Sequence, residues 1–498
     1  MYLFLWQASP KRDIQGDDNL FTLAKQMIAE KEVRRKITIL ETLINSPLVT
    51  TKELAQKMAV SQRTVFNDLQ SLRLELPKDW ELDSDGSNGV FLKTSATEGI
   101  QEIWGIYMQQ SLSMAVLQAL LLKKSIAVPS FLREQGLSYD VLKRQVTKMN
   151  TALQNFQLKI LLDRGEISWS GEETAIRLFY HRLLVPFTHQ HFFFEDYGVH
   201  ESNYHDFLRG LQRQGLAVTT EKIFGICWFF INTIRIKAGC RVEMLAYEED
   251  VLFADYLAAL KDLYRKEGIN LSADESFFAF FCFLESWSYL LSPEVSELLR
   301  KAYPHLFKSA KDFLTRLGMP PGITQDSELL EDLVLFQVKY YESKTLSDKF
   351  LMEYAEVLTV CRQRYPQLFE GIRETLATEG MAGIESVSDH AVSNLVLLIQ
   401  TTLARLNPQS LQTFLVYQGE PAWKQFLLQE LQDLAGRRVE LNEISLGELE
   451  KLTLDSESIV LSNLPIAFEC SGKIVYLSTI PTANELQQFE ELVRKQYI

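Results

Sequence analysis

The sequence predicts a multidomain, mainly α-helical protein that ends in a small α/β domain. The chain has 498 residues, more than the ~250–300 at which a single hydrophobic core stops growing. Apolar residues recur at helical spacing through most of residues 183–407. After Pro408, short apolar runs alternate with amphipathic helices, a pattern typical of a small parallel sheet.

Residues 50–75 have the spacing of two short crossed helices and carry polar side chains near the start of the second helix. A short helix beginning at Thr51 ends at a tight Ala59-Val60 turn, and a second helix opens at Ser61, whose hydroxyl can cap it. This layout predicts a helix-turn-helix, whose second helix enters the major groove of DNA. The alternative is two packed helices with a solvated face. The residues expected to face DNA are Ser61, Gln62, Arg63, Thr64, Phe66 and Asn67.

A predicted β-hairpin follows at residues 80–93, where the sequence alternates on both sides of a Gly/Asn/Ser tip. A hairpin in this position is a wing, and Lys93 could contact phosphate. Upstream, Val33 to Ile44 has helical periodicity and carries the basic triplet at 34–36. That triplet fits either a DNA-facing surface or a solvated helix face.

Residues 112–169 repeat this plan. An apolar helix at 112–122 precedes a helix, turn, helix pattern at 128–149, with Pro129 in a first turn and Gly136 at the turn. Ser138 would cap the second helix. The alternative is a helical connector. The expected outer-side residues are Tyr139, Lys143, Arg144 and Lys148, with Arg164 at the tip of a second hairpin.

Composition describes a globular protein and excludes several classes. Apolar residues make up 46% and charged residues 23%, and no run approaches the roughly 20 apolar residues of a membrane span. The five cysteines stand singly and no HExxH motif is present, which predicts no zinc site, disulfide framework or cofactor. We expect a cytoplasmic, metal-free protein.

The net charge of −14 is unevenly distributed. Residues 1–182 hold 23 basic against 21 acidic side chains, whereas residues 183–498 hold 28 against 44. The acidic part would repel DNA and orient the near-neutral part toward it. Affinity would then depend on local clusters of basic residues.

The order of these parts resembles the Mga/AtxA family of virulence regulators from Gram-positive bacteria. The most specific residues are 51–55 and 60–65. The resemblance implies tandem winged helix-turn-helix domains, two helical regulation domains of the phosphotransferase-system type, and a C-terminal IIB-like domain. The corresponding boundaries are 18–96, 97–182, 183–295, 296–408 and 409–498.

The regulation-domain resemblance has departures. Such domains usually carry a histidine in a helix that begins with an acidic residue, but here Cys282 stands in that place. The position of the second usual histidine is nearest Trp228. Phosphorylation would therefore use other positions or be lost. The histidines considered as phosphoacceptors are His189, His191, His200, His205, His305 and His390.

The IIB-like domain departs too. True IIB enzymes place a nucleophilic cysteine in the loop after the first strand, where a helix N-terminus stabilises phosphate. Here residues 417–421 contain no cysteine, and Glu420 would disfavour an anion. We therefore expect a non-catalytic contact surface. Part of its helix stripe must cover the domain's own sheet. The candidate oligomer contacts are Trp423, Phe426 and Leu427.

Taken together, the sequence favours a DNA-binding transcription regulator of virulence or metabolic genes. We expect it to be an activator and not an enzyme. The expected partners are double-stranded promoter DNA, phosphocarrier proteins of the phosphotransferase system, RNA polymerase, and a second copy of the chain in a homodimer or larger homo-oligomer. One alternative is a phosphocarrier or phosphotransferase-type protein. Another is an RNA-binding antiterminator that shares the regulation domains.

Overall fold

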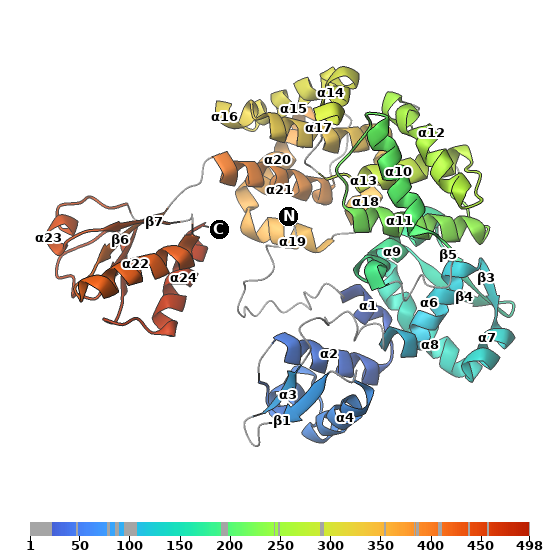
Figure 1. Ribbon diagram of the computed structural model, residues 1–498, viewed down its shortest axis with the longest axis horizontal. Helices are drawn as coiled ribbons and strands as arrows, with labels where there is room; N and C mark the ends of the chain where they lie inside the picture. Colours follow the sequence, from blue (N-terminus) through green and yellow to red (C-terminus); the bar gives the residue numbers. More distant parts are fainter. Residues whose placement is uncertain are drawn as a thin grey trace. The chain divides into compact units, whose positions relative to one another are not determined.

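The computed structural model is mainly helical and divides into two compact units (Figure 1). The first unit comprises residues 1–302 and 339–353, and the second comprises 303–338 and 354–498. The structure describes residues 22–45, 48–76, 80–84, 89–93, 107–190, 198–243, 245–247, 250–288, 293–352, 355–382, 384, 388–406, 411–436, 439–455 and 458–497.

The first helix-turn-helix has the predicted order and a two-stranded wing. The Thr50 side chain and Glu53 form a reciprocal cap at the start of its first helix. The turn places Ala59 at a φ of 53°, and Val60 N donates to Ala55 O across it. Its elements are α2 (Lys31–Asn45), α3 (Thr51–Lys57), α4 (Gln62–Glu75), β1 (Glu81–Ser84) and β2 (Val90–Lys93). The preceding helix α1 (Thr22–Met27) packs against helices of the second helix-turn-helix.

The second helix-turn-helix repeats the plan with a three-stranded sheet of order β3-β5-β4. The predicted hairpin is present, and its tip residues Arg164 and Gly165 both have positive φ, which suits the twist of a tight hairpin. Its elements are α6 (Leu112–Leu122), β3 (Ser125–Ala127), α7 (Val128–Gln135), α8 (Tyr139–Leu153), η2 (Gln154–Phe156), β4 (Lys159–Asp163), β5 (Glu166–Ser170), α9 (Glu173–Leu184) and η3 (Val185–Gln190).

A helical region completes the first unit. The apolar segment around Ile223 to Ile236 is a helix buried along most of its length. Phe350 of α18 packs against Trp228, Phe278 and Phe281, so residues 339–353 belong to this core and not to the second unit. The helices are α10 (Glu201–Arg213), α11 (Lys222–Lys237), α12 (Val251–Lys266), α13 (Ala273–Glu285), α14 (Pro293–Ala302) and α18 (Lys344–Met352).

The second unit begins with another helical region. Helical periodicity continues across residues 294–306, but the chain breaks at Tyr303 and restarts with Pro304 in a first turn. The pattern at 347–365 likewise corresponds to two helices, α18 and α19. The elements are α15 (Pro304–Arg316), α16 (Pro321–Thr324), α17 (Ser327–Glu342), α19 (Ala355–Arg364), α20 (Pro366–Glu379) and α21 (Asp389–Leu406).

The C-terminal domain is the predicted parallel α/β sheet, with strand order β7-β6-β8-β9. Leu427 and Leu431 of α22 and Phe489 of α24 pack on one face of the sheet around Leu415 and Ile459. The opposite face is covered by a smaller apolar cluster. The elements are β6 (Leu411–Val416), α22 (Pro421–Ala435), β7 (Val439–Glu443), α23 (Leu446–Leu449), β8 (Ile459–Ser462), β9 (Lys473–Tyr476) and α24 (Ala483–Tyr497).

Candidate nucleic-acid interface

The predicted recognition helix α4 is capped and presents an open polar face. Ser61 Oγ accepts a hydrogen bond from the Thr64 backbone N–H at 3.1 Å, which confirms the predicted cap. Thr64 is half-buried because its hydroxyl lies against Ser61, and Phe66 keeps 53% of its surface exposed. The exposed side chains without a polar partner among the described residues are Gln62, Arg63 and Asn67.

The basic triplet on α2 anchors α4 instead of lying free on the surface. Arg35 donates to Asp68 of α4 at 2.7 Å and 3.1 Å. Lys36 Nζ lies 2.7 Å from Glu75 Oε1 and 3.0 Å from Glu32 Oε1. The sequence suggested a DNA-facing surface or a solvated helix face for this triplet. Instead, two of its three cations form ion pairs within the unit. They fix the orientation of the recognition helix.

Glu75 is the centre of this anchor. Burial acts to raise the pKa of its carboxyl, but hydrogen bonds from Lys36, Ser71 and Tyr107 outweigh burial, and the net pKa is lowered. Burial and the neighbouring Glu75 raise the pKa of the Tyr107 phenol. Glu75 is therefore charged at neutral pH, and it joins α2 and α4 to Tyr107, which lies ahead of α6 in the chain.

The first wing offers less positive charge than predicted. Lys93 Nζ lies 3.2 Å from Glu81 Oε2 and 3.5 Å from Asp83 Oδ2, and it sits over the ring of Phe91. These exposed pairs are weak, but both carboxylates would repel a phosphate near Lys93. The tip of this wing lies outside the described residues.

The second helix α8 differs from α4 at its start and along its face. Ser138 occupies the predicted N-cap position, but its side chain makes no capping hydrogen bond, so that prediction is wrong. Nothing in the structure explains the difference. Lys148 Nζ donates to Ala29 O at 3.4 Å, which draws it toward the start of α2. Exposed residues without a polar side-chain partner among the described residues are Tyr139, Lys143 and Arg144.

At the tip of the second wing, Arg164 keeps 92% of its side chain exposed. Its guanidinium Nε lies 3.7 Å from Asp163 Oδ2. Such an exposed contact leaves the arginine able to reach another anion.

A buried ionic network joins the second helix-turn-helix to the helices that follow. Arg177 of α9 is fully buried and donates to both carboxylate oxygens of Glu275 on α13, at 2.7 Å and 2.8 Å. Glu173 lies between Arg177 and Arg235, and Arg235 also donates to Leu120 O of α6. Burial would lower the pKa of the Arg177 guanidinium, but Glu275 and Glu173 together outweigh burial and the pKa is raised.

The candidate phosphoacceptor histidines have different surroundings. His200 keeps 68% of its side chain exposed, and its Nδ1 lies 3.3 Å from Oε1 of the buried Glu267. His205 Nε2 lies 3.0 Å from Glu201 Oε1. His305 is exposed and His390 is half-buried. The side chains of His189 and His191 lie outside the described residues.

Sequence reasoning missed His181. This residue is buried on α9, and its ring stacks on Trp228 with centroids 4.1 Å apart. Cys282, which stands where regulation domains place a histidine, is fully buried, and burial raises the pKa of its thiol well above the usual value. Neither group is accessible to a protein that carries a phosphoryl group.

In the loop after β6, the position where IIB enzymes hold phosphate is taken by side chains of the loop itself. Glu420 accepts a hydrogen bond from the Trp423 backbone N–H at 2.8 Å, so its carboxylate takes the anion position at the start of α22. Asn463 donates to Gln418 O and accepts from its N–H, which fastens the loop. Leu427 lies in the domain core and cannot serve as an oligomer contact; Trp423 is partly buried, and Phe426 is 52% exposed.

The described part of the chain contains neither a candidate metal site nor a candidate membrane-spanning helix. There, no group of three or more His, Cys, Asp or Glu side chains could hold a metal ion. Among the helices that are described, none has the length and apolar character needed to cross a membrane.

These features define two successive winged helix-turn-helix units followed by helical regions. Residues 35–90 match the family model of a helix-turn-helix domain, and residues 96–184 match the Mga helix-turn-helix domain. Residues 302–404 match a non-canonical single-stranded DNA-binding domain.

Two characterised proteins of Bacillus anthracis are similar over nearly the whole chain. The anthrax toxin expression trans-acting positive regulator is 22% identical over 488 residues, covering 93% of this chain and 98% of its own. The capsule synthesis positive regulator AcpB is 19% identical, covering 92% and 97%. These matches confirm the resemblance of the chain to Mga/AtxA-type virulence regulators.

Proposed function

We propose that the chain is a DNA-binding transcription regulator that activates virulence or metabolic genes. The observation that carries this proposal is the open polar face of α4, a capped helix held in place by buried ion pairs. An arginine can contact guanine O6 and N7 together, and glutamine or asparagine can contact adenine. Arg63, Gln62 and Asn67 are the corresponding side chains here. That both relatives are named positive regulators supports activation.

The experiment is nuclease footprinting of the purified full chain on genomic promoter fragments. We expect a discrete protected segment of duplex DNA that competitor duplex of unrelated sequence does not displace. Single-stranded RNA of the same sequence serves as the control for an antiterminator. Preferential binding of that RNA would reject the proposal, as would uniform protection of every fragment.

Phosphorylation of His200 would connect this regulator to the phosphotransferase system. When Nδ1 carries the ring proton, the Nδ1–H group donates a hydrogen bond to the Glu267 carboxylate, and Nε2 presents a lone pair to solvent. The P–N bond of a phosphohistidine on the carrier would break as a new P–N bond forms at Nε2. Burial acts to raise the pKa of Glu267, but hydrogen bonds from the His200 N–H, Asn203 and Lys237 lower it, so the carboxylate stays charged.

A continuous set of contacts supports coupling between His200 and the DNA-binding units. Glu267 follows α12, which also carries Tyr264. The Asn232 amide donates to Tyr264 Oη, and Arg177 of α9 donates to Asn232 Oδ1. A phosphoryl group adds nearly two negative charges next to Glu267, and like-charge repulsion would shift the end of α12.

Incubation with the general phosphotransferase proteins, followed by mapping of acid-labile phosphate, tests this step. We expect label in wild type and in His205→Ala, and little label in His200→Ala. His205 is the matched control because its ring already faces Glu201 on the same helix. Equal labelling of His200→Ala and wild type would reject His200 as the phosphoacceptor.

Self-association through the C-terminal domain completes the proposal, because two linked DNA-reading modules bind one promoter more tightly than one. Phe426 is the exposed member of the predicted stripe. The Glu420 cap at the start of α22 disfavours phosphoryl transfer by this domain. In sedimentation, Phe426→Asp should lower the oligomeric mass, whereas substitution of the exposed Gln429 by alanine should leave it unchanged.

A further inference from the structure

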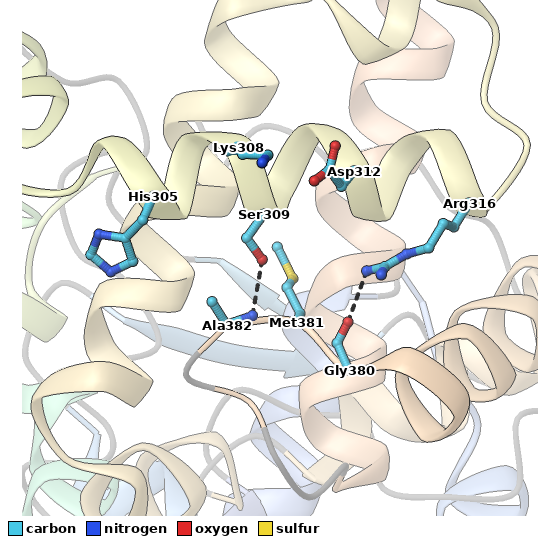
Figure 2. Close-up of a pocket in the computed structure, with 8 residues that line it drawn as sticks. All are labelled: His305, Lys308, Ser309, Asp312, Arg316, Gly380, Met381 and Ala382. Carbon is cyan, nitrogen blue, oxygen red and sulfur yellow. Dashed lines mark hydrogen bonds between the residues drawn. The ribbon is translucent and has the colours of Figure 1, made fainter.

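A groove of about 250 Å³ lies between α15 and the turn that follows α20 (Figure 2). One side is a helix face that carries His305, Lys308 and Asp312 in successive turns. The other side is the turn itself, with the buried Met381 behind it. None of the functions argued above uses this groove.

Hydrogen bonds between the two sides of the groove fix its shape. Arg316 donates to Gly380 O at 2.9 Å, and the Ala382 N–H donates to Ser309 Oγ at 2.9 Å (Figure 2). Gln337 of α17 donates to Ala382 O at 3.0 Å and to Ser309 Oγ at 3.2 Å. Three of these hydrogen bonds hold the turn against α15 and α17, and the fourth joins α17 to α15, so a ligand would meet a preformed site.

The polar groups in the groove favour an anion at one end. Lys308 is exposed and has no polar side-chain partner among the described residues. His305 lies one turn before it on the same helix face. Ser309 Oγ already accepts two hydrogen bonds, which leaves its own proton for a ligand oxygen. An ammonium, an imidazole and a hydroxyl donor together suit a phosphate.

The other end of the groove requires a different chemical group. Asp312 lies one turn beyond Lys308, about 6 Å along the helix, and is exposed. A carboxylate repels phosphate but accepts hydrogen bonds from hydroxyl groups. The groove therefore suits a ligand with a phosphate at one end and hydroxyls at the other. A long polyanion fits less well because Asp312 would face one of its charges.

We propose that this groove binds a small phosphorylated polyol of the sugar-phosphate class. Its phosphate contacts Lys308, His305 and the Ser309 hydroxyl, and its hydroxyls donate to Asp312. This site would bring the regulator a soluble metabolic signal that is independent of histidine phosphorylation and of DNA binding. The match of residues 302–404 to a single-stranded DNA-binding domain makes a single DNA strand the competing ligand.

Isothermal titration of the full chain tests the proposal, with glucose 6-phosphate, glucose, inorganic phosphate and a short single-stranded oligonucleotide as probes. We expect glucose 6-phosphate to bind more tightly than inorganic phosphate, and glucose to bind least. Lys308→Glu should weaken glucose 6-phosphate binding by roughly tenfold or more, which is 1.4 kcal/mol. Lys311→Glu is the matched control, because Lys311 is exposed on the same helix but does not line the groove.

Asp312→Asn separates the two ends of the groove. It should weaken binding of glucose 6-phosphate and leave inorganic phosphate binding unchanged or stronger. Thermal unfolding of each variant confirms that it is folded. The proposal is overturned if glucose 6-phosphate does not bind, if Lys308→Glu binds it as wild type does, or if only the oligonucleotide binds in a Lys308-dependent way.

Discussion

The two helix-turn-helix units share one plan and differ in what holds their second helices. In the first unit, α4 is capped by Ser61 and anchored through Arg35 and Lys36, and its outer face is open. In the second unit, Ser138 does not cap α8, and Lys148 is drawn toward Ala29.

The second unit is instead joined to the helices after it. Arg177 on α9 ties this unit to α13 through Glu275. Arg235 ties α11 to the unit through Glu173 of α9 and the Leu120 carbonyl of α6. At this junction α9 packs against α11 (Figure 1). From this difference we propose that the first copy reads DNA and that the second connects it to the helices that follow.

The largest effect is expected at the buried network. Arg177→Leu leaves the carboxylate of Glu275 buried without its partner, which should cost about 3–5 kcal/mol in the free energy of unfolding. Replacing Arg177 and Glu275 together with leucine should restore part of that loss. Chemical denaturation measures both, with Arg213→Leu on the exposed end of α10 as control. A loss no larger than that of the control would show that the two parts are not joined here.

A smaller effect is expected at the reading helix. Arg63→Ala should weaken binding to the protected duplex by about 1–3 kcal/mol. Arg63→Lys keeps the charge but loses the bidentate contact to guanine. This variant should therefore lose sequence specificity while keeping its non-specific affinity for DNA. Fluorescence anisotropy at fixed salt compares them. If both variants bind the specific duplex like wild type, Arg63 does not contact a base.

The stabilisation of α4 by the Glu75 contacts should be lost at low pH. The folded-state pKa of Glu75 is lowered, so its contribution to stability is present above the unfolded value of about 4.5 and is lost as pH falls through the folded pKa. Glu75→Gln should therefore destabilise the first unit at neutral pH, and this effect should shrink as pH falls below about 4.5. Hydrogen exchange of α2 and α4 reports this. The exposed Glu134→Gln is the control, and a pH-independent loss would contradict the account.

The smallest effect is expected on the face of α8. Lys143→Ala with Arg144→Ala should flatten the salt dependence of DNA binding, by about 0.9 in slope for each phosphate that the variant no longer neutralises. Lys148→Ala should leave the slope nearly unchanged, because this lysine already donates to Ala29 O. Titration of DNA affinity against salt distinguishes them. A slope reduced by Lys148→Ala, with no change in the Lys143→Ala, Arg144→Ala variant, would show that Lys148 contacts phosphate instead.

Local patterns predicted most of the fold. The turn at Ala59, the Ser61 cap, the hairpin tip at Arg164 and the parallel sheet all depend on residues close in sequence, where spacing and turn chemistry decide the outcome. The start of α15 was missed because helical periodicity continues across Tyr303, and only Pro304 marks the break.

The contacts that the sequence could not reveal join distant residues. Arg177 and Glu275 are 98 residues apart, and Arg35 and Asp68 are 33 apart, so no local pattern pairs them. The basic triplet on α2 therefore looked like a surface feature. The same limit applies to His181, whose ring stacks on Trp228 only after α9 and α11 pack.

A matched pair of photo-cross-linking probes tests most directly whether the first unit reads DNA and the second does not. Phe66 and Tyr139 are both exposed aromatic residues near the starts of their helices, at 53% and 44%. Each is replaced by a benzoyl-phenylalanine and irradiated on the protected duplex. The account predicts cross-links from position 66 at one or two discrete bases, and weak, scattered cross-links from position 139. Discrete base cross-links from position 139, with none from position 66, would contradict it.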